Sequence, residues 1–401
     1  MSSSNRSERP GIDDRSALKL VTEMMAIPGK SCEEGRVVQY VRQRLTKAGV
    51  PASSIVIDTA HRRSPAGGEV GNLIVKLPGT KRGPRRMMIG HLDTVPLCEG
   101  SQPVRKGPLI VSRDPRTALG GDNRAGASVV LNAVLEIQRR QLAHPPLTLF
   151  WPVQEEIGLY GARYSSLNRL GSPRLCFNWD GSAPHVATIG ATGDFAIRIE
   201  VEGIASHAGA YPERGVSAVA VAGLAIADLT ENGWHGLIIK GRKSGTSNIG
   251  IVQAGTARAT NVVVPNLTLL AEARSHDPKF RKRIVEEYRK AFQKAVKKVN
   301  NNAGKTAHVQ FEAELKYDSF RLAEDEPAVT TALSVIRAAG LKPEMKVANG
   351  GLDANWMTAR GLPTVTMGCG QQDAHTVDES LHVASFLHAC RVGLLIATGV
   401  D

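Results

Sequence analysis

Hydrophobic positions in the first fifty residues recur at the spacing of an α-helix. Residues 14–27 carry a rough apolar stripe, and a second stripe runs through residues 37–45 and stops at Gly49. Ser31 and Glu34 stand just before the second stripe at the spacing of a capping box. The pattern therefore predicts two amphipathic helices, with a capping box at the start of the second.

Short apolar runs then alternate with a further helical pattern. The runs predict strands, and the helical pattern ends in two Arg, the charge that a helix C-terminus favours. These segments are 72–77, 86–89 and 147–151 for the strands and 125–140 for the helix. Near-continuous apolar strands separated by helices favour a mixed, mainly parallel sheet covered on both faces. The fold class expected for this part is α/β.

The pattern changes near residue 190. Residues 194–202 alternate strictly between apolar and polar side chains, which indicates an antiparallel sheet with one wet face. The order β-α-β-β-α-β follows, typical of a ferredoxin-like α+β unit. Its later segments are a helix at 215–229, strands near 246–253 and 261–273, a helix at 278–300 and a strand at 306–315. We therefore expect 192–316 to be an inserted domain.

The α/β pattern returns near residue 317, with a helix, a buried strand and a final helix at 327–339, 363–368 and 381–398. The first domain is thus expected to be discontinuous, formed by 13–191 and 317–401. Residues 1–12 are polar and are expected to form a disordered tail.

Composition indicates an ordinary globular chain, long enough for more than one domain. Of 401 residues, 42% are hydrophobic and 22% charged. The net charge of +12 is compatible with a nucleic-acid-binding protein. However, the basic residues are scattered along the chain, and only 4% of all residues are aromatic. The predicted helix at 278–300 has an apolar stripe, so its Lys and Arg are expected to be solvated. Nucleic acid is therefore an unlikely partner.

The five cysteines are odd in number and far apart, with no CxxC pair. This pattern favours reduced thiols in a cytoplasmic protein. The polar N-terminus is not a signal peptide, and no run approaches the roughly 20 apolar residues that cross a bilayer. No membrane association is expected.

Five short segments offer side chains that can hold a metal, most of them where a predicted strand meets a loop. Two histidines and three carboxylates can bind two divalent ions if one carboxylate bridges, and paired metals activate water against amides and esters. The candidate ligands are His91, Asp122, Glu156, Asp180 and His375. Each residue taken alone is also compatible with a purely structural role, such as a structural histidine at 91 or a helix N-cap at 122. Together they predict a metallohydrolase.

Two acids next to these ligands have distinct expected roles. Asp93 follows His91 by two positions on the same side of an extended chain, so it can accept the second ring N–H of His91. Glu155 and Glu156 are adjacent and point in different directions, so one can bind metal while the other faces the attacking water as base.

At these residues the chain resembles the family of co-catalytic dizinc peptidases and deacylases. That family includes peptidase T, bacterial glutamate carboxypeptidases, succinyl-diaminopimelate desuccinylase and aminoacylase. The resemblance runs from about Leu18 to Leu395 and rests on six motifs, at 90–94, 121–126, 154–158, 178–181, 206–209 and 374–379. The motifs at 154–158 and 178–181 favour the peptidase T-like branch.

The resemblance implies how the ligands divide between two ions. His91 and Asp180 hold one, Glu156 and His375 hold the other, and Asp122 bridges. It also implies Glu155 as general base and Asp93 as the residue that orients His91. The family's bridging acid is often followed by a second Asp through a cis peptide, and here the follower is Asn123. A cis Asp122–Asn123 bond is therefore expected. The carboxylate charge of the family's second Asp is missing here, because Asn123 is neutral.

The inserted domain resembles the family's lid, which commonly dimerises. The resemblance implies that His207 reaches a neighbouring active site and stabilises an oxyanion. Asn261 and Arg274 match lid positions that hold a substrate carboxylate or carbonyl, although Arg274 could also be a surface ion pair. Asp353 follows a Gly-Gly-Leu sequence where the family has Gly-Gly-Thr, so its substrate-binding role is left open.

The expected activity is hydrolysis of short peptides by a homodimeric metalloexopeptidase. Within that class, a tripeptide aminopeptidase is expected. The expected cofactors are two divalent ions, Zn²⁺ before Co²⁺ or Mn²⁺. An N-acyl amino acid deacylase or carboxypeptidase would use the same metal centre. A non-catalytic metal- or nucleic-acid-binding protein is the alternative from another class.

Overall fold

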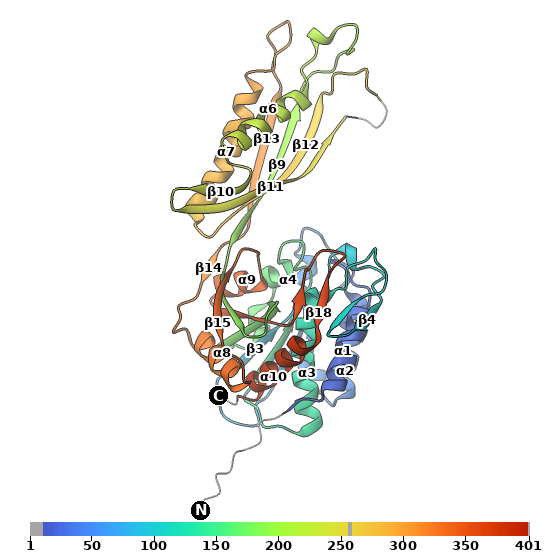
Figure 1. The fold of residues 1–401 in the computed structure, drawn as a ribbon, viewed down its shortest axis with the longest axis vertical. Coiled ribbons are helices and arrows are strands. Elements are labelled where there is room, and N and C mark those ends of the chain that lie inside the picture. The colour runs from blue at the N-terminus through green and yellow to red at the C-terminus, as the bar shows by residue number, and fades with distance from the viewer. Residues whose placement is uncertain (1–10, 256–258, 400–401) are drawn as a thin grey trace, which may run out of the picture. The chain divides into compact units, whose positions relative to one another are not determined.

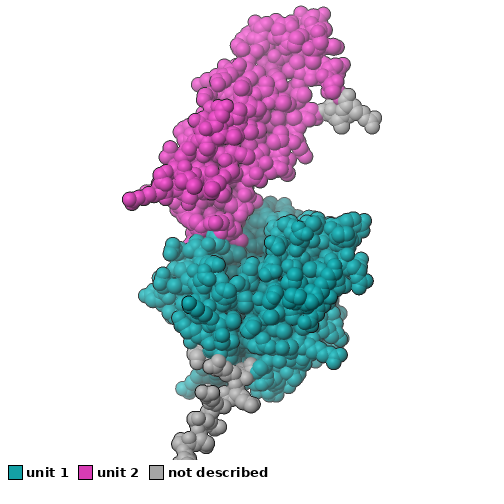
Figure 2. Space-filling model, viewed as in Figure 1, with its two compact units in different colours: residues 1–190, 321–348, 352–401 teal, residues 191–320, 349–351 magenta. Residues whose placement is uncertain are grey.

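The computed structural model describes residues 11–255 and 259–399. The predicted tail at 1–12 lies outside these residues, except for residues 11 and 12, which precede the first helix. Two compact units divide the chain (Figure 2): unit 1 lies within 1–190, 321–348 and 352–401, and unit 2 within 191–320 and 349–351. In the described ranges, no helix combines the length and apolar character that crossing a bilayer requires.

A nine-stranded sheet forms the centre of unit 1 (Figure 1). Its strands are β1 (Ile55–Ile57), β2 (Leu73–Leu77), β3 (Arg86–Ile89), β6 (Leu147–Trp151), β7 (Leu175–Gly181), β8 (Val186–Ala191), β14 (Phe320–Arg321), β15 (Glu344–Ala348) and β16 (Thr364–Gly368). The strand order is β1-β2-β6-β3-β7-β16-β8-β14, and β15 also pairs with β8. The four central strands β6, β3, β7 and β16 are parallel, while β2 and β8 flank them antiparallel.

Helices cover both faces of this sheet, as the apolar strands require. The helices are α1 (Asp14–Met25), α2 (Gly35–Lys47), α3 (Gly121–Arg140), α4 (Tyr160–Tyr164), α5 (Leu167–Leu170), α8 (Pro327–Ala338), α9 (Asp353–Ala359) and α10 (Val383–Thr398). Met87 and Ile89 of β3 pack with Ala162 of α4, Leu170 of α5 and Met357 of α9 in one cluster. Helices α3 and α10 contact each other and β3, and alternation along β3 assigns them to the other face. The expected α/β class is confirmed.

A small sheet and several short 3₁₀ turns complete unit 1. The sheet has the order β17-β18-β5-β4, from β4 (Pro103–Lys106), β5 (Leu109–Ser112), β17 (Gln371–Gln372) and β18 (Ser380–His382). The 3₁₀ turns within the described residues are Ala52–Ser54, Ala60–Arg62, Pro96–Cys98 and, in unit 2, Pro212–Arg214. These short strands join the segment after β16 to the segment before α3.

Unit 2 is an antiparallel sheet with two helices on one face. Its elements are β9 (Gly193–Glu202), α6 (Ala218–Glu231), β10 (Gly236–Lys240), β11 (Lys243–Ala254), β12 (Asn266–Ser275), α7 (Pro278–Val296) and β13 (His308–Tyr317). The order is β10-β11-β12-β9-β13. Without the β10 hairpin strand, which the sequence pattern did not predict, this is the expected ferredoxin-like order. On α7, Phe280, Ile284, Tyr288 and Phe292 are buried in the unit's core, so its apolar stripe packs inward.

The predicted capping box before α2 is wrong. Helix α2 begins at Gly35, its N-cap is Glu34, and no side chain caps it. The Ser31 hydroxyl instead donates to Asp93 Oδ2 at 2.6 Å, and Glu34 Oε1 accepts the backbone N–H of Gln154 at 3.1 Å. Both side chains therefore point toward the segments that follow the sheet strands, and longer-range contacts override the local cap.

Candidate metal centre

The carboxyl ends of the four parallel strands meet at one edge of the sheet and bring the predicted ligands together. His91 follows β3, the Glu155–Glu156 pair follows β6, and Asp180 ends β7. His375 lies in the loop beyond β16, and Asp122 stands at the start of α3. Residues that are far apart in the chain thus form one cluster.

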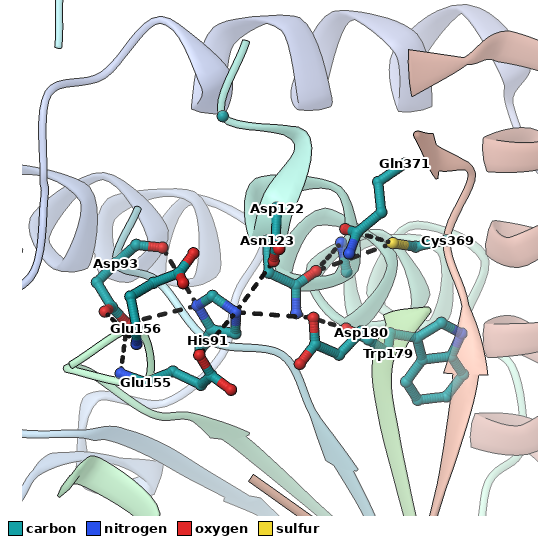
Figure 3. Close-up of polar contacts among 12 residues, drawn as sticks. His91, Asp93, Asp122, Asn123, Glu155, Glu156, Trp179, Asp180, Cys369 and Gln371 are labelled. Atoms are coloured by element: carbon teal, nitrogen blue, oxygen red, sulfur yellow. Dashed lines mark hydrogen bonds and ion pairs between the residues drawn. The ribbon is translucent and has the colours of Figure 1, made fainter. Parts of the chain in front are cut away.

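His91 lies at the middle of this cluster (Figure 3). Its Nε2 is 3.3 Å from Asp122 Oδ1, 3.7 Å from Asp180 Oδ1 and 3.9 Å from Glu155 Oε2. Its Nδ1 is 3.2 Å from the Asp93 carbonyl oxygen and 3.4 Å from Asp93 Oδ1. Both neighbours of Nδ1 are acceptors, so Nδ1 carries a proton. The pKa of His91 lies well above its usual range despite burial, because Glu155, Asp122 and Asp180 surround it. These acids favour positive charge at Nε2, where a metal cation would also be attracted.

Asp122 also faces a second histidine. Its Oδ2 lies 3.3 Å from Nε2 of His375, and the same nitrogen is 2.9 Å from Glu156 Oε2. The two carboxylate oxygens of Asp122 therefore face different histidines, the arrangement that a bridging ligand needs.

In the part of the chain that the structure describes, three overlapping groups of side chains have ligand atoms within 4.8 Å of one another. The groups are His91–Asp122–Asp180, Asp122–Glu156–His375 and His91–Glu155–Glu156. Asp122 Oδ1 and Glu156 Oε1 are buried and have no hydrogen-bond partner. Orphaned buried carboxylate oxygens are costly unless a cation neutralises them. The first two groups fit two divalent ions that share Asp122, and the third offers Glu155 as an alternative ligand.

The charges of the cluster point to the same deficit of positive charge. Burial raises the pKa of Glu155 well above its usual range, and burial raises that of Glu156 to about 7. Burial and the charge of Asp122 raise the pKa of Asp180 to about 6. The pKa of Asp122 itself stays low despite burial, because the imidazoles of His375 and His91 face it. Without a bound cation, the negative charges of these carboxylates repel one another.

The peptide bond between Asp122 and Asn123 is cis, which confirms that expectation. The Asn123 side chain donates to the Trp179 carbonyl oxygen at 2.6 Å and accepts the Gly126 N–H at 2.9 Å. An amide can make both bonds, whereas a carboxylate could not donate the first. Asn123 therefore ties the start of α3 to the end of β7, directly beside Asp180.

Three buried residues that support the cluster were not predicted from the sequence to be part of the site. Glu379 accepts the N–H groups of Gly120 at 2.7 Å and Asp122 at 2.8 Å. Glu34 accepts the N–H of Gln154 at 3.1 Å. Arg124 is 1% exposed, donates to a backbone carbonyl, and its charge acts on Asp93 and Glu34. The first two contacts span more than a hundred positions, so no local pattern could reveal them.

Unit 2 holds three of the candidates, which are described here within that unit alone. Nδ1 of the exposed His207 accepts the N–H groups of Gly209 at 3.2 Å and Ala210 at 3.1 Å, so the proton sits on Nε2. Arg274 donates to Glu272 at 2.8 Å and lies 3.9 Å from Asp194. The structure thus contains the ion pair that was the alternative expectation for Arg274. Asn261 is exposed.

Asp353 begins α9 in unit 1 and is fully buried. Neither of its carboxylate oxygens has a hydrogen-bond partner. Burial raises the pKa of Asp353 well above the usual range, and the charges of His91 and Asp180 also act on it. A cavity of about 310 Å³ adjoins this region and is lined by Leu352 and Asp180 among others.

Comparison with known proteins agrees with this architecture. The family model of the peptidase dimerisation domain, M20_dimer, matches residues 189–300. The YqjE protein of Bacillus subtilis is 26% identical over 96% of this chain and 98% of its own length. A tripeptidase from Staphylococcus aureus superposes with a TM-score of 0.84 at 26% identity, over 98% of this chain and 99% of that one. The aminopeptidase PepT from Bacillus cereus gives 0.79 at 27% identity, over 97% and 99%. The chain therefore carries a match to the peptidase dimerisation domain at 189–300 and resembles peptidase T-like M20 peptidases over almost its whole length, which supports a metal-dependent peptide hydrolase.

Proposed function

We propose that the chain is a two-metal tripeptide aminopeptidase. The observation that carries the proposal is the carboxylate of Asp122, whose two oxygens face His91 and His375 at 3.3 Å each. Each histidine has a further acid beside it, Asp180 and Glu156 respectively. This donor set of imidazoles and carboxylates suits Zn²⁺, and also Co²⁺ or Mn²⁺.

In this proposal His91 and Asp180 would hold the first ion, Glu156 and His375 would hold the second, and Asp122 would contribute to both. Two such ions would polarise an amide carbonyl and lower the pKa of water. Asp93 fixes the ring of His91 through Nδ1–H, so that Nε2 presents its lone pair. The same Asp93 accepts the backbone N–H groups of Glu155 at 3.0 Å and Glu156 at 3.1 Å.

Glu155 is the proposed general base. Its side chain is left over once four ligands and the bridge are assigned, and it lies 3.9 Å from His91 Nε2. It takes a proton from the attacking water and then gives that proton to the leaving amine, so the carboxylate is regenerated in each turnover. With the ions bound, Glu155 would be ionised, because nearby opposite charge favours the charged form.

The oxyanion of the tetrahedral intermediate is assigned to His207 of a partner subunit. Support comes from its tautomer: Nδ1 accepts two backbone N–H groups, which leaves Nε2–H as a donor. The match to a peptidase dimerisation domain at 189–300 supports a homodimer formed through unit 2. Arg274 and Asn261 are proposed to bind the substrate's carboxylate or carbonyl, and Asp353 to line its pocket.

The tripeptide assignment rests on the tripeptidase and aminopeptidase named above, each of which this chain covers almost entirely. A cytoplasmic location stays a prediction from the cysteines, all five of which are free in the structure.

Metal content and hydrolysis of a tripeptide, with and without chelator, test the proposal together. About two ions per chain and chelator-sensitive release of the N-terminal residue are expected. Two ions with cleavage of N-acetyl or N-succinyl amino acids, but not of tripeptides, would assign the centre to a deacylase or carboxypeptidase instead. Absence of bound metal and of hydrolysis would overturn the proposal.

A further inference from the structure

Glu34 lies at the end of the loop before α2 and is fully buried. Its Oε1 accepts the backbone N–H of Cys32 at 2.9 Å and that of Gln154 at 3.1 Å. One oxygen therefore joins its own loop to the segment that follows β6, 120 positions along the chain. The other oxygen, Oε2, has no hydrogen-bond partner.

The segment that Glu34 holds carries the proposed base. Three consecutive N–H groups end on buried carboxylates: that of Gln154 on Glu34, and those of Glu155 and Glu156 on the two oxygens of Asp93. Asp93 also contacts His91, so it is tied to the metal cluster itself. Two carboxylates accept these three N–H groups, and of the two, Glu34 belongs to the loop before α2.

The backbone at Gln154 needs such a restraint. Its φ of 57° is left-handed, a conformation that residues other than glycine adopt only when their surroundings enforce it. The turn at Gln154 sets the direction in which the next residue leaves β6. A carboxylate oxygen on the Gln154 N–H therefore controls where the side chain of Glu155 points.

We propose that Glu34 is a positioning residue for the general base: its Oε1 fixes the left-handed turn at Gln154 and so aims Glu155 at the water that attacks the amide. The inference rests on the proposed role of Glu155 and deepens it. The hydrogen bonds of the Glu34 side chain go to the backbone N–H groups of Cys32 and Gln154, so it acts on Glu155 through the backbone.

What Glu34 supplies is an acceptor atom rather than a charge. Burial, together with the negative charge of Asp93, raises the pKa of Glu34 to about 8. Removing the charge thus relieves a repulsion, and a glutamine places a carbonyl oxygen at the position of Oε1. Glu34→Gln keeps the acceptor, Glu34→Asp withdraws it by one methylene, and Glu34→Ala removes it.

The kinetic test compares these variants on an amide substrate that the metal-loaded wild-type protein cleaves. Glu34→Ala is expected to lower kcat by about 10–100-fold with little change in KM, the usual effect of losing a supporting hydrogen bond. Glu34→Gln is expected to retain most of the turnover, and Glu34→Asp to fall below it. Glu33→Ala, which removes the exposed neighbouring acid that pairs with Lys30, is the matched control. A glutamine variant as slow as the alanine variant would overturn the proposal.

Hydrogen–deuterium exchange of the peptide around 152–158 tests the same idea without activity. Faster exchange in Glu34→Ala, with wild-type exchange in Glu34→Gln and Glu33→Ala and metal content unchanged, is the expected result. Exchange that does not respond to the alanine would refute the positioning role, whatever the substrate proves to be. If the wild-type protein cleaves no tripeptide while the exchange pattern holds, the proposed function fails and the hydrogen-bond relation stands. If Glu34→Ala does not fold, the order of kcat between the Gln and Asp variants decides.

Discussion

Glu379 Oε1 accepts the backbone N–H of Asp122 at 2.8 Å, while its second oxygen accepts that of Gly120 at 2.7 Å. The carboxylate therefore clamps the turn from which the proposed bridging ligand projects. Glu379 is 2% exposed and lies four positions after His375, another predicted ligand. One short segment thus provides a ligand and the support for a second.

Replacing Glu379 with Ala is expected to weaken metal binding rather than unfold the protein. Loss of a hydrogen-bonded support of a ligand typically costs about 10–100-fold in metal affinity. Titration of the metal-free protein with Zn²⁺ measures the effect. Asp378→Ala, which removes the exposed acid next to it, is the control. Equal affinities in the two variants would contradict the supporting role.

Glu155→Ala is expected to keep the fold and two metal ions while kcat falls by about 10²–10⁴-fold, the usual contribution of a general base. Elemental analysis of the purified variant accompanies the kinetics. Glu155 is also one of the four acids grouped with His91 as possible ligands. A variant that holds only one ion would make Glu155 a ligand, and one with full turnover would remove it from the mechanism.

If His207 acts on the partner's site, mixed dimers should recover activity that neither parent has. His207→Ala and Glu155→Ala are each expected to be nearly inactive. In a mixed dimer, the subunit that carries His207→Ala keeps its own Glu155 and receives an intact His207 from its partner. Co-refolding equal amounts should restore about a quarter of wild-type activity, one intact site in half of the dimers. Failure to recover any activity would place His207 in its own subunit's site or outside catalysis.

Gly126 has no room for a side chain. A Cβ there would collide with the Trp179 carbonyl oxygen and with Oδ1 of Asn123. Gly126→Ala is expected to destabilise unit 1 by about 1–3 kcal/mol, as overpacking does. It should also disturb metal binding, because Asp180 follows Trp179. Gly223→Ala in α6, where a Cβ meets nothing within 4 Å, is the control and should be neutral or slightly stabilising in denaturant unfolding.

Much of the candidate site could be predicted because its ligands stand where strands end. His91, Glu156 and Asp180 follow or end neighbouring parallel strands, so their meeting is a consequence of the sheet. Apolar runs identify such strands directly. The span Gly121–Arg140 of α3 includes a non-helical turn at Asp122 and Asn123, so its regular part begins close to the predicted residue 125.

The failures of local reasoning have physical causes. Ser31 and Glu34 match a capping box, but each makes a long-range bond to the loops after β3 or β6 instead. Local and global preferences often diverge in this way at functional sites. The strands β4, β5, β17 and β18 have two to four residues each, too few to show alternation. The edge strand β10 has a single buried residue, Ile238, so it too lacks a periodic signal.

The discontinuity of unit 1 has a consequence for biosynthesis. His91, Asp122, Glu156 and Asp180 all precede the inserted unit in the chain, whereas His375 and its neighbour Glu379 follow it. Because chains emerge from the ribosome N-terminus first, the whole of unit 2 is made while the cluster still lacks one histidine and the clamp on Asp122. In the proposed arrangement, a nascent chain can therefore offer all three donors of the first ion, but it lacks His375 for the second. The proposed two-metal site can be completed only when translation is nearly finished.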